Sequence, residues 1–221
     1  MLCLLQAHEP GVPFIYAPAL AVMDPRNARL RNASMEFTVM GAAATEMARY
    51  YGLPAESSPG ASDAHVPNIQ CAYESAAMAL PAALSWPDIF VGPGLLDGSM
   101  VSSLEQLLID VEIFRFAKQA HRGVVTDDEK WLTDVIKEVG PGGNYIARPS
   151  TLSSVRSGEW FLSKLGAHDA YENWRASHKG EFLEEVREKV DQILATHEPL
   201  PLDEDVEKEL DKICKRARDQ S

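Results

Sequence analysis

Cysteine is scarce in this sequence, and Cys3, Cys71 and Cys214 lie far apart with no Cys-x-x-Cys spacing. This pattern gives no support to a disulfide framework or a zinc site. The apolar stretch at residues 1–5 is too short for the core of a secretory signal and has no basic residues before it. No run approaches the roughly 18 apolar residues that a membrane span needs. We therefore expect a cytoplasmic protein that does not bind a membrane.

Basic residues are also few, with 21 Lys and Arg against 33 Asp and Glu and a net charge of -12. Nucleic-acid binding needs clustered Lys and Arg, so the balance argues against a nucleic-acid partner. The charges are unevenly spread, since residues 1–100 hold 9 acids and 4 bases and the rest of the chain holds 24 and 17. The chain therefore changes character near its middle.

What the sequence does have is enough apolar material for a core, with 45% hydrophobic residues in 221. A chain of this size and composition folds as one or two domains. In the first half the apolar pattern changes between strand and helix three times. The predicted strands are residues 12–17, 55–57 and 88–92, and the predicted helices are residues 35–51, 68–84 and 102–121.

Regular alternation of this kind predicts parallel strands joined by right-handed crossovers. The loops at residues 18–33, 58–67 and 93–101 would then lie together at the carboxyl ends of the strands, where β/α folds place their sites. Ser34 and Gly52 are expected to begin and end the first helix, and Ser102 with Glu105 to form a capping box for the third.

The second half is predicted to be helical and to serve as scaffold. A capping box at residues 126–129 precedes the first apolar repeat, and the repeats cover residues 132–139, 183–194 and 206–217. We expect two domains, residues 1–122 and residues 123–221.

Residues 61–74 gather polar side chains at a loop-to-helix junction within an otherwise apolar region. Such junctions are where sites are expected. A structural explanation stands beside this one: Asp63 as an Asx-turn residue, Pro67 or Asn68 as a helix start, and Gln70 with Glu74 as a polar stripe at i and i+4.

Within that stretch, Ser62, Asp63, Pro67, Gln70 and Glu74 resemble the signature Ser-Asp-x-Lys-x-Pro-x-x-Gln-x-x-x-Glu of the trimethylamine methyltransferase family. Further collinear matches are Pro10-Gly11, Glu36, residues 48–54, residues 103–107, Ile109-Asp110, residues 138–140 and residues 188–190.

The resembled family folds as an eight-unit barrel, and such barrels take about 250 residues or more. The resemblance therefore implies a partial TIM-type (β/α) barrel of about three β/α units, followed by appended C-terminal helices. Residues 1–7 would be the tail of a helix whose strand is absent, and the chain would correspond to the carboxyl-terminal part of the family, a fragment inactive alone.

Members of that family move a methyl group from a methylated amine to the cobalt of a separate corrinoid protein. The trimethylamine enzyme has pyrrolysine immediately before Ser-Asp, where this chain has Ala61. The resemblance implies a homologue without pyrrolysine, acting on a quaternary amine such as glycine betaine. It also implies no cofactor bound directly by this chain, a corrinoid carried by a partner protein, and a homo-oligomer.

A quaternary ammonium has no N–H, so its site must offer aromatic faces and negative charge. Tyr16 and Asp63 are the candidates for that role. His65 stands where the family usually has lysine and could hydrogen-bond a substrate carboxylate or Asp63, or could be an exposed loop residue.

Four further residues are predicted to support the site without touching substrate. Gln70 and Glu74 share a helix face near it. Glu36 and Glu105 match family positions, but each opens a helix, where a carboxylate satisfies free N–H groups whatever the function. No metal site is expected. The alternative to the enzyme is a non-catalytic β/α remnant, whose open edges would lead it to associate.

Overall fold

The computed structural model describes residues 2–18, 20, 22–177 and 180–219. The chain divides into two compact units, Met1–Arg187 and Glu188–Ser221. The predicted domain boundary after residue 122 stays a prediction.

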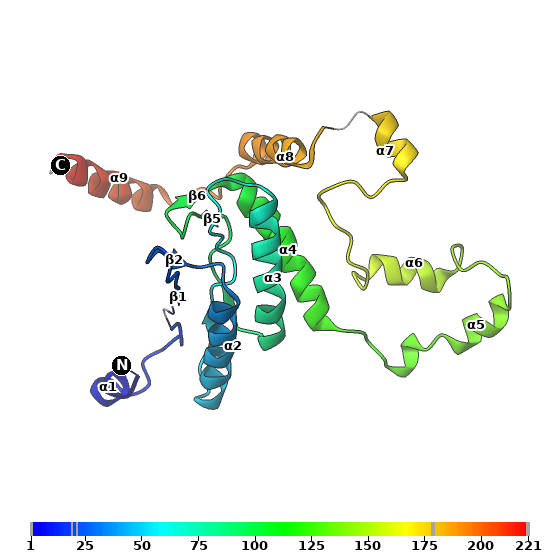
Figure 1. The fold of residues 1–221 in the computed structure, drawn as a ribbon, viewed down its shortest axis with the longest axis horizontal. Coiled ribbons are helices and arrows are strands. Elements are labelled where there is room, and N and C mark those ends of the chain that lie inside the picture. The colour runs from blue at the N-terminus through cyan, green and yellow to red at the C-terminus, as the bar shows by residue number, and fades with distance from the viewer. Residues whose placement is uncertain (1, 19, 21, 178–179, 220–221) are drawn as a thin grey trace. The chain divides into compact units, whose positions relative to one another are not determined.

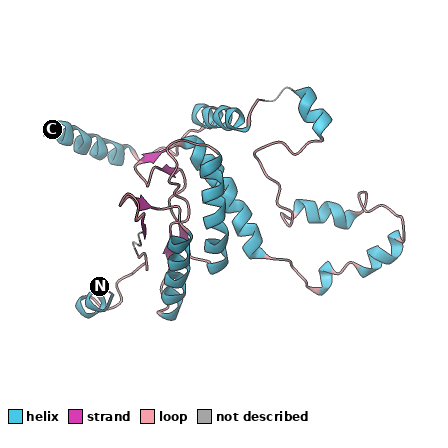
Figure 2. Ribbon diagram, in the orientation of Figure 1, coloured by secondary structure: helices cyan, strands magenta, loops and turns pink. Residues whose placement is uncertain are grey.

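The three predicted strand segments are parallel neighbours, as expected. Tyr16 forms a parallel bridge with Ala55, and β3 (Glu56–Ser57) pairs in parallel with β4 (Ile89–Phe90). The segments are shorter than predicted, and the first is a single bridge rather than a strand over residues 12–17 (Figure 2). Pro13 and Pro18 flank this bridge and cannot donate a backbone hydrogen bond, which limits the ladder.

The three predicted helices are present as α2 (Met35–Tyr50), α3 (Ile69–Ser85) and α4 (Leu104–Arg122). Each begins at a polar cap: Ser34, Asn68 and Ser103 accept hydrogen bonds from the backbone N–H three residues later. The predicted capping box at Ser102 was therefore wrong by one residue. Gly52 follows α2 at φ +66°, the left-handed conformation expected of a helix stop.

Helix α3 packs against α2 on one side and α4 on the other (Figure 1). The contact between α3 and α4 is built on alanine, with Ala79, Ala83 and Ala117 buried beneath Phe90 and Phe114. Small side chains let the two helices approach closely, while the caps Asn68 and Ser103 set where each helix begins. Because each of these helices starts directly after one of the polar loops, this packing also positions the loops.

Two short antiparallel hairpins lie in segments that were predicted as loops. One pairs β1 (Val22–Met23) with β2 (Leu30–Arg31), and the other pairs β5 (Leu95–Leu96) with β6 (Val101–Ser102). Strands of two residues are too short to show an alternating pattern, so no periodicity predicts them. The described strands form three two-stranded sheets, and the partial barrel stays a prediction.

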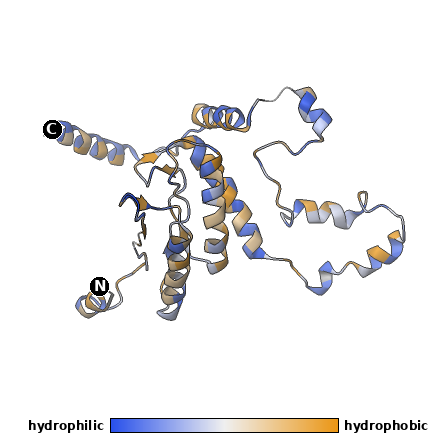
Figure 3. Cartoon of the chain, viewed as in Figure 1, coloured by the Kyte–Doolittle hydropathy of each residue, from blue (hydrophilic) through white to orange (hydrophobic). Residues whose placement is uncertain are grey.

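The rest of the first unit contains short helices. These are α1 (Leu2–His8), η1 (Asp128–Lys130), α5 (Thr133–Val139), α6 (Pro149–Arg156) and α7 (Tyr171–Ser177). The expected capping box at Thr126 was wrong, because Asp127 caps the short η1 instead. Helices α6 and α7 were not predicted. Figure 3 shows polar and apolar residues mixed along α5 and α6, and no described residue of α5, α6 or α7 is buried.

The predicted helix at residues 183–194 is α8 (Phe182–Thr196), and the start of α8 lies in the first unit. There Val186 is fully buried against Ile109 and Leu165. The second unit holds the rest of α8 and α9 (Glu204–Asp219), which opens with acids and ends with Arg216 and Arg218 as its dipole favours. Within the part of the chain that the structure describes, no helix is long and apolar enough to cross a membrane.

Candidate functional site

The three loops predicted to converge do so, through charged side chains. Arg31 Nε lies 2.5 Å from Asp63 Oδ2, which joins the first loop to the second. Arg29 Nη2 lies 2.8 Å from Asp97 Oδ1, and His65 Nδ1 lies 2.9 Å from the same oxygen, so the third loop meets both others. Loops that follow neighbouring parallel strands have been brought to one place, as β/α topology requires.

The second and third loops touch through their backbones as well. A Cβ on Gly60 would lie 2.6 Å from the backbone nitrogen of Pro93, so only glycine allows this approach. Beyond it the Ser62 N–H donates to Leu95 O at 2.9 Å, and the Asp97 N–H donates to Ala64 O at 2.9 Å. The loop after β3 thus packs directly against the loop after β4 through backbone contacts.

Glu74 on α3 holds the turn at Ser62 and Asp63 in place. Its side chain is buried, and Oε2 accepts hydrogen bonds from Ser62 Oγ at 2.6 Å and from the Asp63 N–H at 3.0 Å. Gln70 Nε2 donates to the other oxygen at 2.9 Å. A buried carboxylate whose oxygens are all bonded fixes the groups that bond to it. The contacts are those that a supporting role needs, and that role stays a prediction.

A second buried carboxylate, Asp110 on α4, holds the start of the third loop. It accepts from the Gly94 N–H at 2.7 Å and from Gln106 Nε2 at 2.8 Å, and it is fully inaccessible to solvent. Burial raises the pKa of Asp110, although these hydrogen bonds oppose the shift. Asp110 was not predicted as a site residue. The sequence contains a feature that could have predicted it, since Gln106 and Asp110 lie at i and i+4 on the apolar face of a helix.

A cleft of about 240 Å³ opens where the three loops meet. It is lined by three arginines, three aspartates and a histidine: Asp24, Arg26, Arg29, Arg31, Asp63, His65 and Asp97. Arg31 joins two of the acids, because its Nη1 also lies 3.2 Å from Asp24 Oδ2. The hydrogen bonds from the Arg26 side chain and backbone hold the pKa of Asp24 far below its usual range.

Sequence reasoning missed five charged residues of this cleft, Asp24, Arg26, Arg29, Arg31 and Asp97. The signal for the arginines was their crowding, since three of the four basic residues in residues 1–100 fall within residues 26–31. Counting the bases in residues 1–100 showed that they are few but not that three of them are clustered.

The predicted substrate residues fall in different places. Asp63 lines the cleft, but its carboxylate is already engaged by Arg31 and by the Asn32 N–H at 2.9 Å. His65 also lines the cleft, with 69% of its side chain exposed, and its partner is Asp97 rather than Asp63. Tyr16 is half-buried, pairs with residues 54–56 through its backbone, and is not among the described residues that line the cleft.

The remaining predicted residues lie around the loops. Ala61 is buried next to the Ser-Asp turn. Glu36 is exposed in the first turn of α2. Glu105 accepts from Ser103 Oγ at 2.7 Å in the first turn of α4, and that hydroxyl lowers its pKa. Both glutamates thus sit where the helix-start explanation placed them. No group of three His, Cys, Asp or Glu side chains suited to a metal occurs among the residues with a described position.

Comparison with known proteins shows which family the chain resembles. The family model described as trimethylamine methyltransferase matches residues 1–221. The trimethylamine methyltransferases MttB of Desulfitobacterium hafniense and of Methanosarcina barkeri are each 30% identical, over 98% and 97% of this chain. A glycine betaine methyltransferase of Desulfitobacterium hafniense is 30% identical over 94% of it.

The chain spans 43% of the length of each of these curated relatives. The match to the family model extends over the whole of the present chain, however, and includes the Ser-Asp turn and the two residues that hold it. The chain belongs to the trimethylamine methyltransferase family.

Proposed function

We propose that this chain carries the substrate cleft of a methyltransferase for a quaternary amine that bears a carboxylate, such as glycine betaine. The methyl acceptor would be a corrinoid held by a separate partner protein, whose cobalt supplies the nucleophile. Because the curated relatives are more than twice as long as this chain, we assign turnover to a polypeptide of full family length and expect none from these residues alone.

The observation that carries this proposal is the chemistry of the cleft. Its arginines are unusual in a half of the chain that holds few bases, and Arg26 and Arg29 keep 78% and 61% of their side chains exposed. A guanidinium has five N–H donors in a planar fork that matches a carboxylate. Each pair with an aspartate uses only some of them, so donors remain for a substrate carboxylate. Trimethylamine has no carboxylate for these donors to bind.

The position before Ser-Asp supports the same substrate class. Ala61 has a buried methyl group and no electrophile that could capture a tertiary amine. Methyl transfer breaks a C–N bond whose electron pair stays on nitrogen. From a neutral amine this would expel a strongly basic amide anion, whereas a quaternary nitrogen leaves as a neutral tertiary amine.

The cationic end of the substrate needs a different environment. A quaternary ammonium gains about 0.5–2 kcal/mol from each aromatic face that it contacts. Among the residues that we predicted, Tyr16 is the aromatic candidate, on the segment next to β3. Asp24, Asp63 and Asp97 are the carboxylates at the cleft, each already paired with an arginine. The cleft therefore favours a zwitterion over a bare cation.

The test is to replace Arg29 by glutamine in a polypeptide of full family length and to compare glycine betaine with choline, which has the same ammonium but no carboxylate. Losing a charge-assisted hydrogen bond costs about 1.5–3 kcal/mol, so KM for glycine betaine should rise roughly tenfold or more. The value of kcat should stay within about twofold, because the lost contact holds the substrate in ground and transition state alike.

The matched control is Arg175→Gln on α7, which removes the same charge outside the cleft and should leave both KM values unchanged. Choline should be insensitive to Arg29→Gln. If glycine betaine were equally insensitive, or if both substrates lost the same factor, the cleft would not be a carboxylate site and the proposal would be wrong.

A further inference from the structure

A second cleft, of about 760 Å³, lies at the other end of α3 and α4. Its walls are the last turns of α4, Trp86 at the end of α3, and residues 155–162 around the end of α6. Both helices begin at the loop cluster, and α3 has 17 residues. At 1.5 Å per residue the two clefts are about 25 Å apart along α3. This cleft is thus separate from the proposed methyl-transfer site.

The charge of the cleft differs from that of the chain. Four permanently charged side chains line it, Arg115, Lys118, Arg122 and Arg156, and none of its described lining residues is Asp or Glu. The chain as a whole has a net charge of -12. A cleft lined by one sign of charge concentrates ligands of the opposite sign.

Nearby acids offset only part of this charge. Glu112 accepts from Arg115 at 2.6 Å, and Glu159 is engaged by Lys130 at 2.9 Å. Neither Lys118 nor Arg156 has an ion-pair or hydrogen-bond partner among the residues that the structure describes. Two cations are therefore available to a ligand.

Helix dipoles explain part of the pattern but not all of it. Basic residues stabilise the last turn of a helix, which accounts for Arg122 on α4 and Arg156 on α6. Lys118 lies a full turn earlier on α4. The negative ends of two helices amount to roughly half a charge each, and the cations of the cleft exceed this even with Arg115 paired to Glu112.

Aromatic rings accompany the cations. Trp86 stacks on His121 with centroids 3.7 Å apart, and Arg115 lies 5.3 Å from the centroid of the Phe161 ring. Trp160 is 63% exposed and has no ring partner among the described residues. An exposed indole beside unpaired cations is suited to a ligand with a flat ring and a negative charge.

We propose that this second cleft binds a nucleoside phosphate. The base would stack on Trp160, and the phosphates would bind Lys118 and Arg156, with Arg122 beside them. The volume lies within the range of about 300–1,000 Å³ that is usual for sites of small ligands. Proteins that bind nucleic-acid strands without sequence preference stack the bases on aromatic rings and bind the phosphates with cations. The side chains of this cleft offer both kinds of contact.

The test is titration of the 221-residue chain with adenosine 5′-diphosphate, followed by tryptophan fluorescence. We expect saturable quenching, and weaker binding of adenosine alone and of pyrophosphate alone. The double variant Lys118→Glu with Arg156→Glu should weaken binding more than tenfold, and Trp160→Leu should weaken it by about fivefold or more, the loss typical of one stacked base. Since both cations are exposed, a thermal melt close to that of the unchanged chain would show that the variants fold.

The matched control is Lys137→Glu on α5, an exposed lysine outside the cleft, which should leave the Kd unchanged. No saturable quenching at millimolar diphosphate would overturn the proposal. So would variants that bind as tightly as the unchanged chain, or a tetraglutamate peptide or pyrophosphate that binds as tightly as the diphosphate.

Discussion

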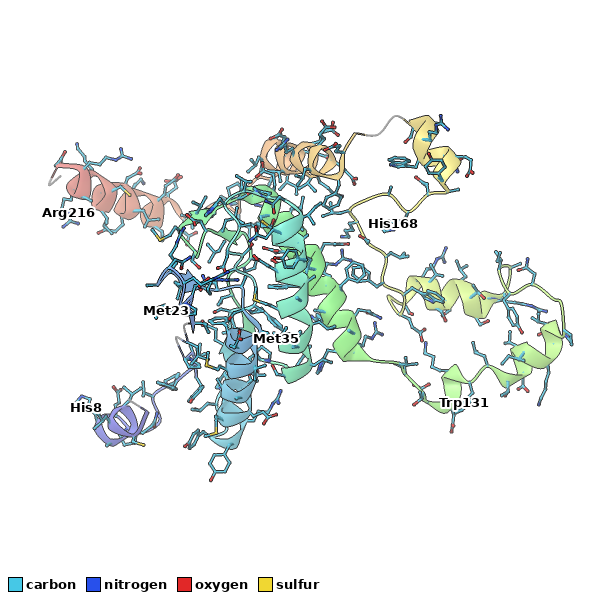
Figure 4. All side chains as sticks on the ribbon, in the orientation of Figure 1. His8, Met23, Met35, Trp131, His168 and Arg216 are labelled. Carbon is cyan, nitrogen blue, oxygen red and sulfur yellow. The ribbon has the colours of Figure 1, made fainter. Side chains whose placement is uncertain are left out.

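Residues 54–122 and residues 123–177 differ in how their side chains are used. In the first stretch polar groups are buried and bonded across long sequence separations, as Glu74 is to Ser62 and Asp110 to Gly94. In the second stretch Leu165 is the one buried residue among those whose burial is described, and large apolar side chains such as Trp131, which is 63% exposed, lie at the surface (Figure 4).

The first stretch positions the loops of the candidate site, whereas the second stretch forms short helices with little packing between them. Helices of seven or eight residues such as α5 and α6 gain little stability alone, because helix nucleation is costly and helices shorter than about 12 residues are marginal in water. The helices α3 and α4 are longer, pack on each other, and hold the loops at their starts through buried carboxylates. We therefore expect substitutions to be costly in the first stretch and mild in the second.

The largest expected difference is between two leucines. Leu96 is 1% exposed and packs with Cys71 and Ala64, whereas Leu152 on α6 is 50% exposed. Leu96→Ala should lower the free energy of unfolding by about 2–5 kcal/mol, since it leaves a cavity. Leu152→Ala should lower it by less than about 1 kcal/mol. Urea unfolding checks both, and equal losses would remove the distinction between the two stretches.

Asp110→Ala should come next, at about 3 kcal/mol, because it leaves the Gly94 N–H and the Gln106 amide buried without an acceptor. Asp110→Asn keeps one acceptor oxygen and should cost less than half as much. Urea unfolding at neutral pH gives both values. A similar loss in both variants would mean that the charge, and not the hydrogen bonds, is what the fold needs at this position.

The stability of the unchanged chain relative to Asp110→Asn should also depend on pH, in the opposite direction to that expected for a surface acid paired with a base. Burial raises the pKa of Asp110 in the folded chain above its ordinary value of 3.8, so the folded state binds the proton more tightly. Its contribution to stability is complete below pH 3.8 and is lost as pH rises towards the raised pKa. Relative to Asp110→Asn, the unchanged chain should thus lose stability with rising pH. A gain over that window would contradict the assignment.

A smaller effect is expected at the Ser-Asp turn. Glu74→Gln turns a buried carboxylate into an amide facing donors from Ser62 and Asp63, and should lower stability by about 1–2 kcal/mol. Hydrogen exchange at the Asp63 amide should quicken, because that N–H loses a charged acceptor. Glu36→Gln, at an exposed glutamate in the first turn of α2, is the control: it should cost less than about 1 kcal/mol and leave exchange at Asp63 unchanged. Unchanged exchange at Asp63 would show that the turn is held without Glu74.

Much of the first stretch could be predicted from sequence because its signals are local and periodic. The apolar repeats placed α2, α3 and α4, and strand-helix alternation placed three parallel segments as neighbours and three loops together. The hairpins β1–β2 and β5–β6 could not be predicted, since their pairs are only two residues long.

The candidate site was predictable in position but not in chemistry. Asp63 and His65 were found from the loop-to-helix pattern, but their partners Arg31 and Asp97 lie 32 residues away in each case. Ion pairs of this kind depend on loop conformation, which has no period in the sequence. Reading Asp63 as a free negative charge therefore missed the arginine that it binds.

The most direct measurement is methyl transfer by a polypeptide of full family length with the proposed corrinoid partner protein, followed by the absorbance change when the reduced cobalt is methylated. Glycine betaine should be demethylated and trimethylamine should not, because Ala61 cannot capture a tertiary amine and well-placed groups supply only about 3–4 kcal/mol each. Turnover of trimethylamine as fast as that of glycine betaine would contradict this account, and turnover of neither would favour a non-catalytic protein.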